Sequence, residues 1–485
     1  MSPILILFIF IAYTALLFAI TWVTSKRANN QSFYTGNKAS PWFVVAYGMI
    51  GASLSGVTFM SVPGQVQSVH FTYMLMVFGN FAGYLTIALV LLPLYYRLNL
   101  TSIYTYLEKR FGFWSYKTGA GFFMLSRIMG ASLRMFLVIY VLQRFVFDAW
   151  NVPFWINATI FILLIIIYTL RGGIKTIIWT DTLQTTFMIL AVILSVVFIC
   201  RHTGNSFGQM MTTIKYQGYM RMFDWDWHSE RFFLKQFFSG MFVCIAMTGL
   251  DQEMMQKNLS CKNLKEAQKN MFTFSVILVG VVFLFLVLGG FLAYYAKTVV
   301  VVVEATDDLF PTIALKYMGP VAGIAFMIGL ISAAFPSADG ALTSLTTSFT
   351  IDFLELDKKD ISEEEKKKIR YKVHICIALI LLTCIIIFKN LNNKAIIDEI
   401  FTIAGYTYGP LLGLYAFGLF TKRSVLDKAT PAIAIISPVI CFLLDKYSVQ
   451  LFNGYKFGFE LLLLNGFITF IGLLLFSKKS EKETV

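Results

Sequence analysis

The sequence predicts an all-α polytopic membrane protein with about thirteen transmembrane helices. Three observations lead to this prediction. Of the 485 residues, 57% are hydrophobic and only 14% are charged, and a water-soluble chain of this size could not bury so much apolar surface. Runs of about 20 apolar residues, the length that crosses a bilayer, recur along the whole chain. One run, 42–66, contains a polar interruption, Gly-Ala-Ser-Leu-Ser-Gly at 51–56.

The first apolar run resembles a signal peptide only superficially. It lacks a basic start and a small-residue cleavage site, and it is too long for the apolar part of such a peptide. We therefore expect it to remain as a membrane helix. The predicted spans are 3–24, 41–67, 72–97, 119–146, 153–170, 176–201, 233–256, 270–296, 319–353, 370–388, 396–420, 429–445 and 457–477.

The distribution of basic residues predicts the orientation. An odd number of spans puts the two termini on opposite sides of the membrane. With the C-terminus inside, most of the 40 Lys and Arg residues lie in inner loops, so the positive-inside rule favours an outside N-terminus and a cytoplasmic C-terminus. We expect a bacterial inner membrane. The inner loops are 25–40, 97–118, 171–175, 256–269 (with Lys257), 354–372, 421–428 and the tail.

Composition also argues against other classes of function. The net charge of +13 does not indicate a nucleic-acid partner, because the basic residues are spread over short loops instead of one patch. A membrane-embedded enzyme is the alternative from another class. We expect no enzyme, since the histidines are scattered and no phosphate-binding loop or Gly-x-Ser-x-Gly motif occurs.

The interruption at 51–56 is the strongest functional signal in the chain. A bilayer cannot hydrogen-bond a free backbone, so an unwound stretch at membrane depth persists only where it lines a site. Broken helices near the midplane hold ions and substrates in secondary transporters. The interruption therefore predicts a transporter.

Four stretches together resemble the sodium:solute symporter family, and in particular its bacterial members that carry sialic acids and sugars. They occur in the same order and spacing as in that family. The resemblance covers nearly the whole chain. The stretches are 51–61, 172–184, 249–257, and 332–337 running on to 348–352.

This resemblance implies a LeuT-type fold, with two inverted repeats of five helices, one helix before them and two after. The implied divisions are 1–40, 41–201, an extracellular loop at 202–232, 233–421 and 422–485. It also implies import of a small organic solute with Na+ by alternating access. The solute would be of the sialic acid, amino acid or monocarboxylate type, and a proton-coupled or sugar/polyol symporter is the alternative. We expect a monomer in the lipid bilayer.

The resemblance places the main sodium site between the second and ninth spans. Its ligands would be the carbonyls of Gly51, Leu54 and Ala333 and the hydroxyl of Ser337. Neutral oxygens of this kind cost less inside a membrane than buried carboxylates. Many members carry a hydroxyl residue just before the serine, whereas this chain has Pro336. Either the site has one ligand fewer, or a kink at the proline lets a backbone oxygen substitute.

Two acidic residues lie close to this site in the sequence pattern. Asp181 matches an aspartate that belongs to a second sodium site in some members, and Asp339 stands where those members have a serine. With Thr343, the two acids would form an ion site or accept a proton, because intramembrane acids are functional candidates by default. The alternative is that Asp339 pairs with Arg134 and serves structure.

The solute pocket is expected beside the interrupted helix. By resemblance, Ser53, Ser55 and Thr58 face the solute there. Family members that carry sugars have a glutamate, and members that carry sialic acids a glutamine, at the position of Val77, so the apolar residue here disfavours a hexose. Tyr73 on the third span and Thr248 on the seventh, next to Met247, complete the expected lining.

Arg134 is the sharpest clue to the solute. Sialic-acid members carry a carboxylate-binding arginine at the position of Gly130, one helical turn away. A guanidinium can hold a carboxylate through two hydrogen bonds, so an anionic solute is one interpretation. The other is an internal salt bridge from Arg134 to Asp339 or Asp181. Arg127, nearer the cytoplasmic end, is expected to extend to the membrane surface.

The eleventh span carries Tyr406 and Tyr408 before a Gly-Pro pair. The two rings could gate the cytoplasmic exit, although tyrosines near a helix break are also ordinary packing residues. Asp251 and Gln252, at the inner end of the seventh span, are expected to cap and tie helix ends and not to bind the solute.

Overall fold

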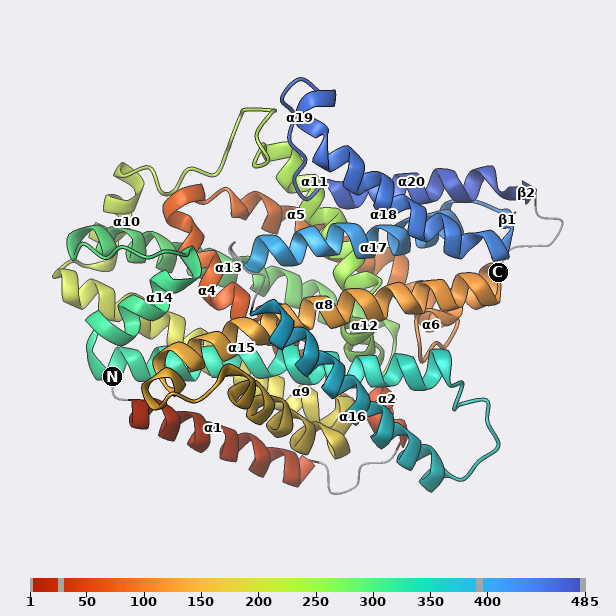
Figure 1. Ribbon diagram of the computed structural model, residues 1–485, viewed down its shortest axis with the longest axis horizontal. Helices are drawn as coiled ribbons and strands as arrows, with labels where there is room; N and C mark the ends of the chain where they lie inside the picture. The colour runs from red at the N-terminus through yellow and green to blue at the C-terminus, as the bar shows by residue number, and fades with distance from the viewer. Residues whose placement is uncertain (1–2, 25–29, 390–395, 480–485) are drawn as a thin grey trace.

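The computed structural model describes residues 3–24, 30–389 and 396–479, and within them the chain is almost entirely helical (Figure 1). The helices are α1 Pro3–Thr24, α2 Asn30–Thr35, α3 Trp42–Ser53, α4 Gly56–Val69, α5 Tyr73–Thr86, α6 Leu92–Arg97, α7 Thr105–Arg110, α8 Phe113–Phe145, α9 Phe154–Thr203, α10 Phe207–Tyr216, α11 Phe233–Cys244, α12 Gln252–Leu259, α13 Leu264–Thr298, α14 Leu309–Thr312, α15 Gly319–Ser348, α16 Glu363–Phe388, α17 Ile396–Phe420, α18 Thr430–Lys446, α19 Ser448–Leu451 and α20 Leu461–Leu475.

Within the described residues, eight helices are long and apolar enough to cross a membrane, or ten when each of two bent pairs is counted as one span. Two further apolar segments, Phe154–Leu170 and Leu461–Leu475, are shorter. A small antiparallel sheet pairs β1 (Arg423–Val425) with β2 (Ser477–Lys479). The predicted all-α membrane architecture is therefore confirmed at this level.

The two bent pairs interrupt the second and seventh predicted spans. α3 and α4 meet at 58°, and the segment Phe233–Gly249 meets α12 at 66°. The first break falls at Leu54 and Ser55, whose backbones leave the helical region (φ −92°, ψ 77° and φ −68°, ψ 172°). The interruption that the sequence predicts at 51–56 is confirmed, and the last carbonyls of α3 are without the amides of a following helical turn, so they can serve as ligands.

A third interruption occurs inside α9, between the fifth and sixth predicted spans. Gly173 has φ +55° and ψ −158°, a conformation that residues with a side chain rarely adopt. A Cβ at this position would also lie 2.4 Å from Cα of Phe33. The glycine thus allows the chain to change direction between two helical segments of α9 that follow each other without a loop.

α15 is the most deeply buried of the long apolar helices among the described residues, and it packs along α9 as the second central helix. α15 is buried from Leu330 through Ser348 and packs against α9, α8, α3, α4 and α1. Its sequence is rich in Ala, Ser, Thr and Gly, which allow helices to approach closely inside a membrane. α3 also packs on α9. The break between α3 and α4 is therefore held against both central helices.

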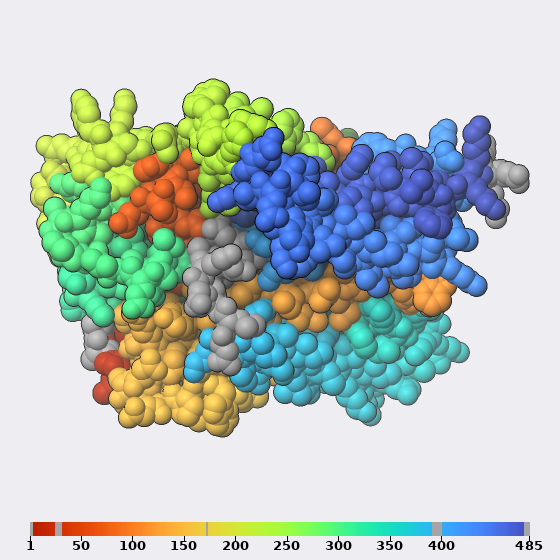
Figure 2. Space-filling model, turned by 45° about the horizontal axis from the view of Figure 1, so that its top comes forward, coloured from red at the N-terminus to blue at the C-terminus, as the bar shows by residue number. Residues whose placement is uncertain are grey.

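The long helices run roughly parallel to the long axis of the molecule, and the connections gather at its two ends (Figure 1). The start of α1, with α10 and α14, lies at the left end. β1, β2 and the segment between α15 and α16 lie at the right end. Figure 2 shows the C-terminal helices (dark blue) beside the yellow-green segment that leads into α11. Trp227 and Tyr455 make a ring contact there at 5.8 Å.

Candidate functional site

A pocket opens beside the break between α3 and α4. All of the residues that the sequence analysis assigns to the solute line it. They come from the break itself, from α5, from α8 and from the π-helical turn that follows α11, and they are Ser53, Ser55, Thr58, Tyr73, Val77, Arg134 and Thr248. The structure therefore brings together, from four segments, a set that is scattered over almost 200 positions.

The lining contains polar residues that the sequence analysis missed, and Asn80 is the one with the clearest sequence signal. Asn80 lies three residues after Val77 on α5 and lines the same pocket. Residues three apart share a helix face, so its spacing from Val77 would have identified it. The apolar part of the wall includes Met247, Leu278 and Phe401. The pocket thus combines a few polar groups with an apolar surface, as small-solute sites do.

Arg134 is the charged group that distinguishes this pocket. It is partly buried and lines the pocket from α8. Among the residues that the structure describes, no carboxylate lies within ion-pair distance of its guanidinium. The expected alternative, a salt bridge to Asp181 or Asp339, is therefore absent in this part of the chain, since both acids have other partners.

Arg127 does not extend to the membrane surface, and that expectation is wrong. Its side chain is buried, lines the pocket and pairs with two acids at the start of α12. Nη1 lies 3.5 Å from Oδ2 of Asp251, and Nη2 contacts Glu253. A charge this deep stays only where it is paired. The two buried acids retain Arg127 inside.

The acids and the amide at the second break tie the helix ends, as expected. Asp251 caps α12 by accepting from the amides of Glu253 (3.0 Å) and Met254 (3.2 Å). Gln252 accepts from the amide of Ile103 (3.0 Å) and donates to the carbonyl of Thr101 (2.8 Å). The inner half of the broken span is thereby fixed to the segment before α7.

The candidate sodium ligands lie on the facing parts of α3 and α15. The amide of Gly51 donates to Oγ1 of Thr185 on α9, 2.9 Å away. Leu54 is one of the two non-helical residues of the break. Ala333 and Ser337 are buried on α15, and Oγ of Ser337 has no hydrogen-bond partner among the described residues. An unpaired hydroxyl in such a place is costly, so it is an available ligand.

Pro336 does not break α15. The helix continues from Gly319 through Ser348 with the proline inside it. Because proline has no N–H, the carbonyl one turn earlier, that of Ser332, cannot receive its usual helical hydrogen bond. Of the two sequence-based alternatives, the backbone oxygen therefore has a candidate in the carbonyl of Ser332.

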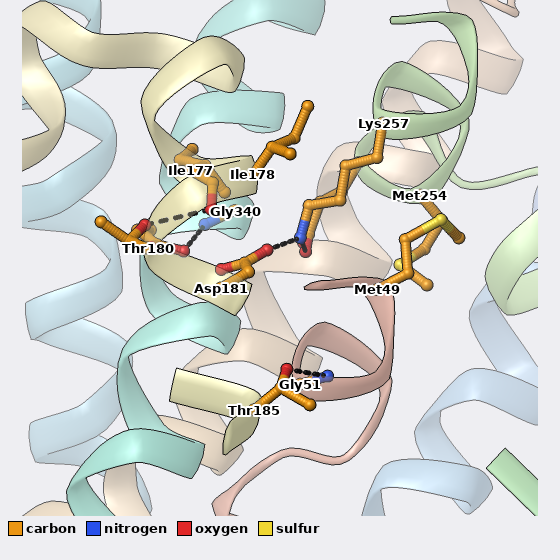
Figure 3. Close-up of polar contacts among 12 residues, drawn as sticks. Met49, Gly51, Ile177, Ile178, Thr180, Asp181, Thr185, Met254, Lys257 and Gly340 are labelled. Carbon is orange, nitrogen blue, oxygen red and sulfur yellow. Dashed lines mark hydrogen bonds and ion pairs between the residues drawn. The ribbon is translucent and has the colours of Figure 1, made fainter. Parts of the chain in front are cut away.

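Asp181 has a partner that the sequence analysis assigned to a loop. Lys257 belongs to α12, and its ammonium lies 2.7 Å from Oδ2 of Asp181 (Figure 3). Both side chains are 1% exposed. The inclusion of Lys257 among the loop cations of 256–269 is therefore wrong. The bend after Gly249 turns α12 inward, and Nζ also lies 3.5 Å from Oε1 of Glu253, one turn earlier.

Asp339 has a different set of partners. Tyr168 donates its phenol to one carboxylate oxygen, and the amide of Gly340 donates to the other at 2.5 Å. Asp339 is close enough to Asp181 and Lys257 to interact with both electrostatically. Oγ1 of Thr343, one turn further along α15, has no hydrogen-bond partner among the described residues.

The two candidate gate tyrosines contact acids at different places. Tyr408 is buried and donates to Oδ2 of Asp251 at 2.7 Å. Tyr406 is half-buried and donates to Oδ2 of Asp445 on α18 at 2.9 Å. Neither lines the solute pocket, whereas Phe401 on the same helix does. The structure thus joins Tyr408, and not Tyr406, to the second helix break.

Known proteins resemble this chain over most of its length. The family model described as "Sodium:solute symporter family" matches residues 33–430. The chain is 24% identical to the sodium/sialic acid symporter NanT of Aliivibrio fischeri, over 94% of this chain and 91% of that protein. It is 25% identical to the sodium/sialic acid symporter SiaT of Proteus mirabilis, over 92% and 89%.

A solved structure has a similar fold. It is a substrate-bound, outward-open Na+-coupled sialic acid symporter, with a TM-score of 0.82 and 21% identity. The match covers 98% of this chain and 99% of that one.

Proposed function

This chain belongs to the sodium:solute symporter family, and from that membership we propose that it imports a small carboxylate-bearing organic solute together with sodium. Relatives of this chain are named as sodium-coupled symporters of sialic acids and as sodium-coupled monocarboxylate transporters. The observation that carries the choice of solute is the guanidinium of Arg134, which lines the pocket and has no carboxylate partner among the described residues.

A carboxylate on the solute would satisfy Arg134. A guanidinium binds a carboxylate through two parallel hydrogen bonds, which fix both distance and orientation. Ser53 contributes a buried hydroxyl without a described hydrogen-bond partner, and Ser55, Thr58, Thr248 and Tyr73 line the same pocket. The relatives named as sialic acid symporters make a sialic acid, which carries a carboxylate and several hydroxyls, the first solute to test.

We place the main sodium ion at the carbonyls of Gly51, Leu54 and Ala333 and the hydroxyl of Ser337. Two observations support this. The helix breaks at Leu54 and Ser55, so carbonyls there lie outside regular helix, and Oγ of Ser337 is buried and unpaired among the described residues. Asp181 and Asp339 are the acids nearest to this site in the sequence pattern, and Lys257 balances the charge of Asp181.

The same sodium site connects to the solute pocket through the broken helix. Leu54 is a proposed sodium ligand, and Ser53 and Ser55 on either side of it line the pocket. Sodium bound at Leu54 would therefore order the two residues that face the solute. Each ligand then raises the affinity for the other by the same factor.

For the architecture we propose thirteen transmembrane spans with a core of two five-helix repeats, 41–201 and 233–421. The segments 1–40 and 422–485 and the loop 202–232 lie outside the two repeats. The two bent spans support it, because α3/α4 and α11/α12 are the first helices of the two repeats and bend by similar angles, 58° and 66°. Discontinuous helices in corresponding positions of two repeats are typical of such transporters.

We propose an outside N-terminus and a cytoplasmic C-terminus in a bacterial inner membrane. α10 from the predicted outer loop lies at the end of the molecule where α1 begins, and β2 lies at the opposite end (Figure 1). Transport then follows alternating access. Tyr408 and Arg127 hold the inner half of the second broken span through Asp251 while the solute binds, and release of these contacts opens the inner side.

The test is solute uptake by the purified protein in proteoliposomes with an inward sodium gradient. We expect uptake of a sialic acid or another small carboxylate, inhibited by other carboxylates and not by uncharged sugars. Arg134→Ala should abolish solute binding without reducing sodium binding, and Arg134→Lys should retain part of the affinity. Full uptake by Arg134→Ala would contradict the carboxylate assignment.

A further inference from the structure

The ion pair between Lys257 and Asp181 lies inside the proposed transport core. Nζ of Lys257 is 2.7 Å from Oδ2 of Asp181, and both side chains are 1% exposed (Figure 3). The pair joins α12, the inner half of the second broken span, to α9. No other cation lies within ion-pair distance of Asp181 among the described residues.

Asp181 also lies directly against α3, where the proposed sodium ligands begin. A Cβ built on Gly48 would be 3.2 Å from Cβ of Asp181, and one built on Gly51 would be 3.4 Å from its carbonyl oxygen. Asp181 on α9 therefore lies next to the part of α3 that carries the proposed sodium ligand Gly51. It is the position in which a second transported cation would find a fully buried negative charge.

A carboxylate this deep in a membrane requires a counter-cation. The cost of burying it alone is several kcal/mol or more, so it is stable there only when a cation pairs with it or a proton neutralises it. A sodium ion and a lysine ammonium both supply one positive charge and both take oxygen partners. In this chain the ammonium occupies the oxygen of Asp181 that faces α12, and Oδ1 has no hydrogen-bond partner among the described residues.

The other acids near the pair do not replace Asp181 as the main partner of Lys257. Glu253 approaches the same ammonium at the longer distance of 3.5 Å and is also paired with Arg127. Asp339 receives hydrogen bonds from Tyr168 and Gly340. Lys257 is thus the dedicated partner of Asp181.

We propose that the Lys257 ammonium is a resident cation that takes the place of a second sodium ion at Asp181, so that Lys257 sets the number of sodium ions coupled to each solute. The proposal rests on the proposed function, because it counts sodium ions in addition to the one proposed at Gly51, Leu54, Ala333 and Ser337. It makes Lys257 a specificity-determining residue for coupling. A neutral side chain at 257 would leave Asp181 to bind sodium itself.

The experiment measures bound radioactive sodium per purified protein at saturation, without solute. We expect Lys257→Gln to bind one sodium ion more than the wild type. Lys257→Arg, which keeps the charge, should bind the same number as the wild type. In proteoliposomes, the membrane potential that stops solute-coupled current should shift in Lys257→Gln as expected for one additional charge per solute, and it should not shift in Lys257→Arg.

The double variant Asp181→Asn/Lys257→Gln provides the decisive control. It removes both charges of the pair, and such replacements are tolerated better than removal of one partner. We expect its sodium count to equal that of the wild type. A count lower by one would show that Asp181 holds a transported sodium ion in the wild type and would overturn the proposal. A Lys257→Gln count equal to the wild type would do the same.

The sodium counts distinguish a failure of this proposal from a failure of the proposed function. If the wild type binds no sodium and Lys257→Gln binds one, the main sodium site is wrong and the role of Lys257 stands. If the wild type binds sodium and loses it in Ser337→Ala, but Lys257→Gln gains none, the main site stands and the resident cation is refuted. Should Lys257→Gln fail to fold, the double variant keeps the proposal falsifiable, because a count one below the wild type would overturn it.

Discussion

The amide of Gly51 donates a hydrogen bond of 2.9 Å to Oγ1 of Thr185, and this bond joins the last turn of α3 to α9 (Figure 3). Gly51 is three residues before the helix break, and a Cβ at Gly51 would lie only 2.4 Å from the same hydroxyl oxygen. The two helices therefore meet at this point without any space between them. The position of the carbonyls proposed to bind sodium depends on this contact.

Replacing Thr185 by valine should weaken sodium binding without removing a ligand. Valine keeps the shape of threonine but leaves the amide of Gly51 without its partner, at a cost of about 1–3 kcal/mol. We expect a rise of about tenfold in the sodium concentration that gives half-maximal stabilisation. Thr383→Val, on the exposed face of α16, is the control and should not change it. An unchanged sodium response in Thr185→Val would show that this bond does not position the site.

Alanine substitutions at the two arginines of the pocket should have different effects, one on protein stability and the other on solute binding. Arg127→Ala leaves Asp251 and Glu253 buried without their cation, which costs about 3–5 kcal/mol of stability. Arg134→Ala breaks no described ion pair, so we expect little change in the unfolding temperature and loss of solute binding. Thermal unfolding and solute-binding measurements on the same preparations check this. Equal destabilisation by both variants would contradict the assigned roles.

The hydroxyl of Tyr408 should matter more than that of Tyr406. Tyr408→Phe removes a buried hydrogen bond to Asp251, and we expect a loss of about 1–3 kcal/mol in stability. Tyr406→Phe removes a half-buried bond to Asp445 and should cost less. The comparison uses thermal unfolding in detergent. A larger effect for Tyr406→Phe would mean that the contact to Asp445, and not that to Asp251, holds α17.

Removal of sodium should weaken solute binding by the same factor by which solute tightens sodium binding. This reciprocity is a thermodynamic requirement, and couplings between sites are typically about 5–150-fold. Calorimetric titration of the solute in sodium and in potassium gives one factor, and titration of sodium with and without solute gives the other. Solute affinity that does not change between sodium and potassium would refute coupling through Leu54.

Several features of this site could be predicted from the sequence because they depend on local pattern. The break at Leu54 and Ser55 follows from small polar residues inside an apolar run, and the helix bends there by 58°. The pocket lining around Ser53 and Thr58 follows from the position of that break. The capping role of Asp251 likewise depends on residues close to it in the chain.

The ion pairs could not be predicted in the same way. Lys257 stands at the end of an apolar run, where a cation usually marks an inner loop. Its burial depends on the 66° bend that turns α12 toward α9, and its partner is 76 residues earlier in the chain. Arg127 is retained by two acids more than 120 positions away. Such pairings depend on tertiary packing, which hydropathy does not report.

The most direct test of the central claim is the unfolding temperature of the purified protein in sodium against potassium. A ligand that binds only the folded state stabilises it by about 2.7 kcal/mol at 100 times its Kd. We predict that sodium stabilises the wild type specifically, that Ser337→Ala loses this effect, and that Ser332→Ala, whose hydroxyl contacts Tyr13, keeps it. No sodium-specific stabilisation of the wild type, or full stabilisation of Ser337→Ala, would contradict the account.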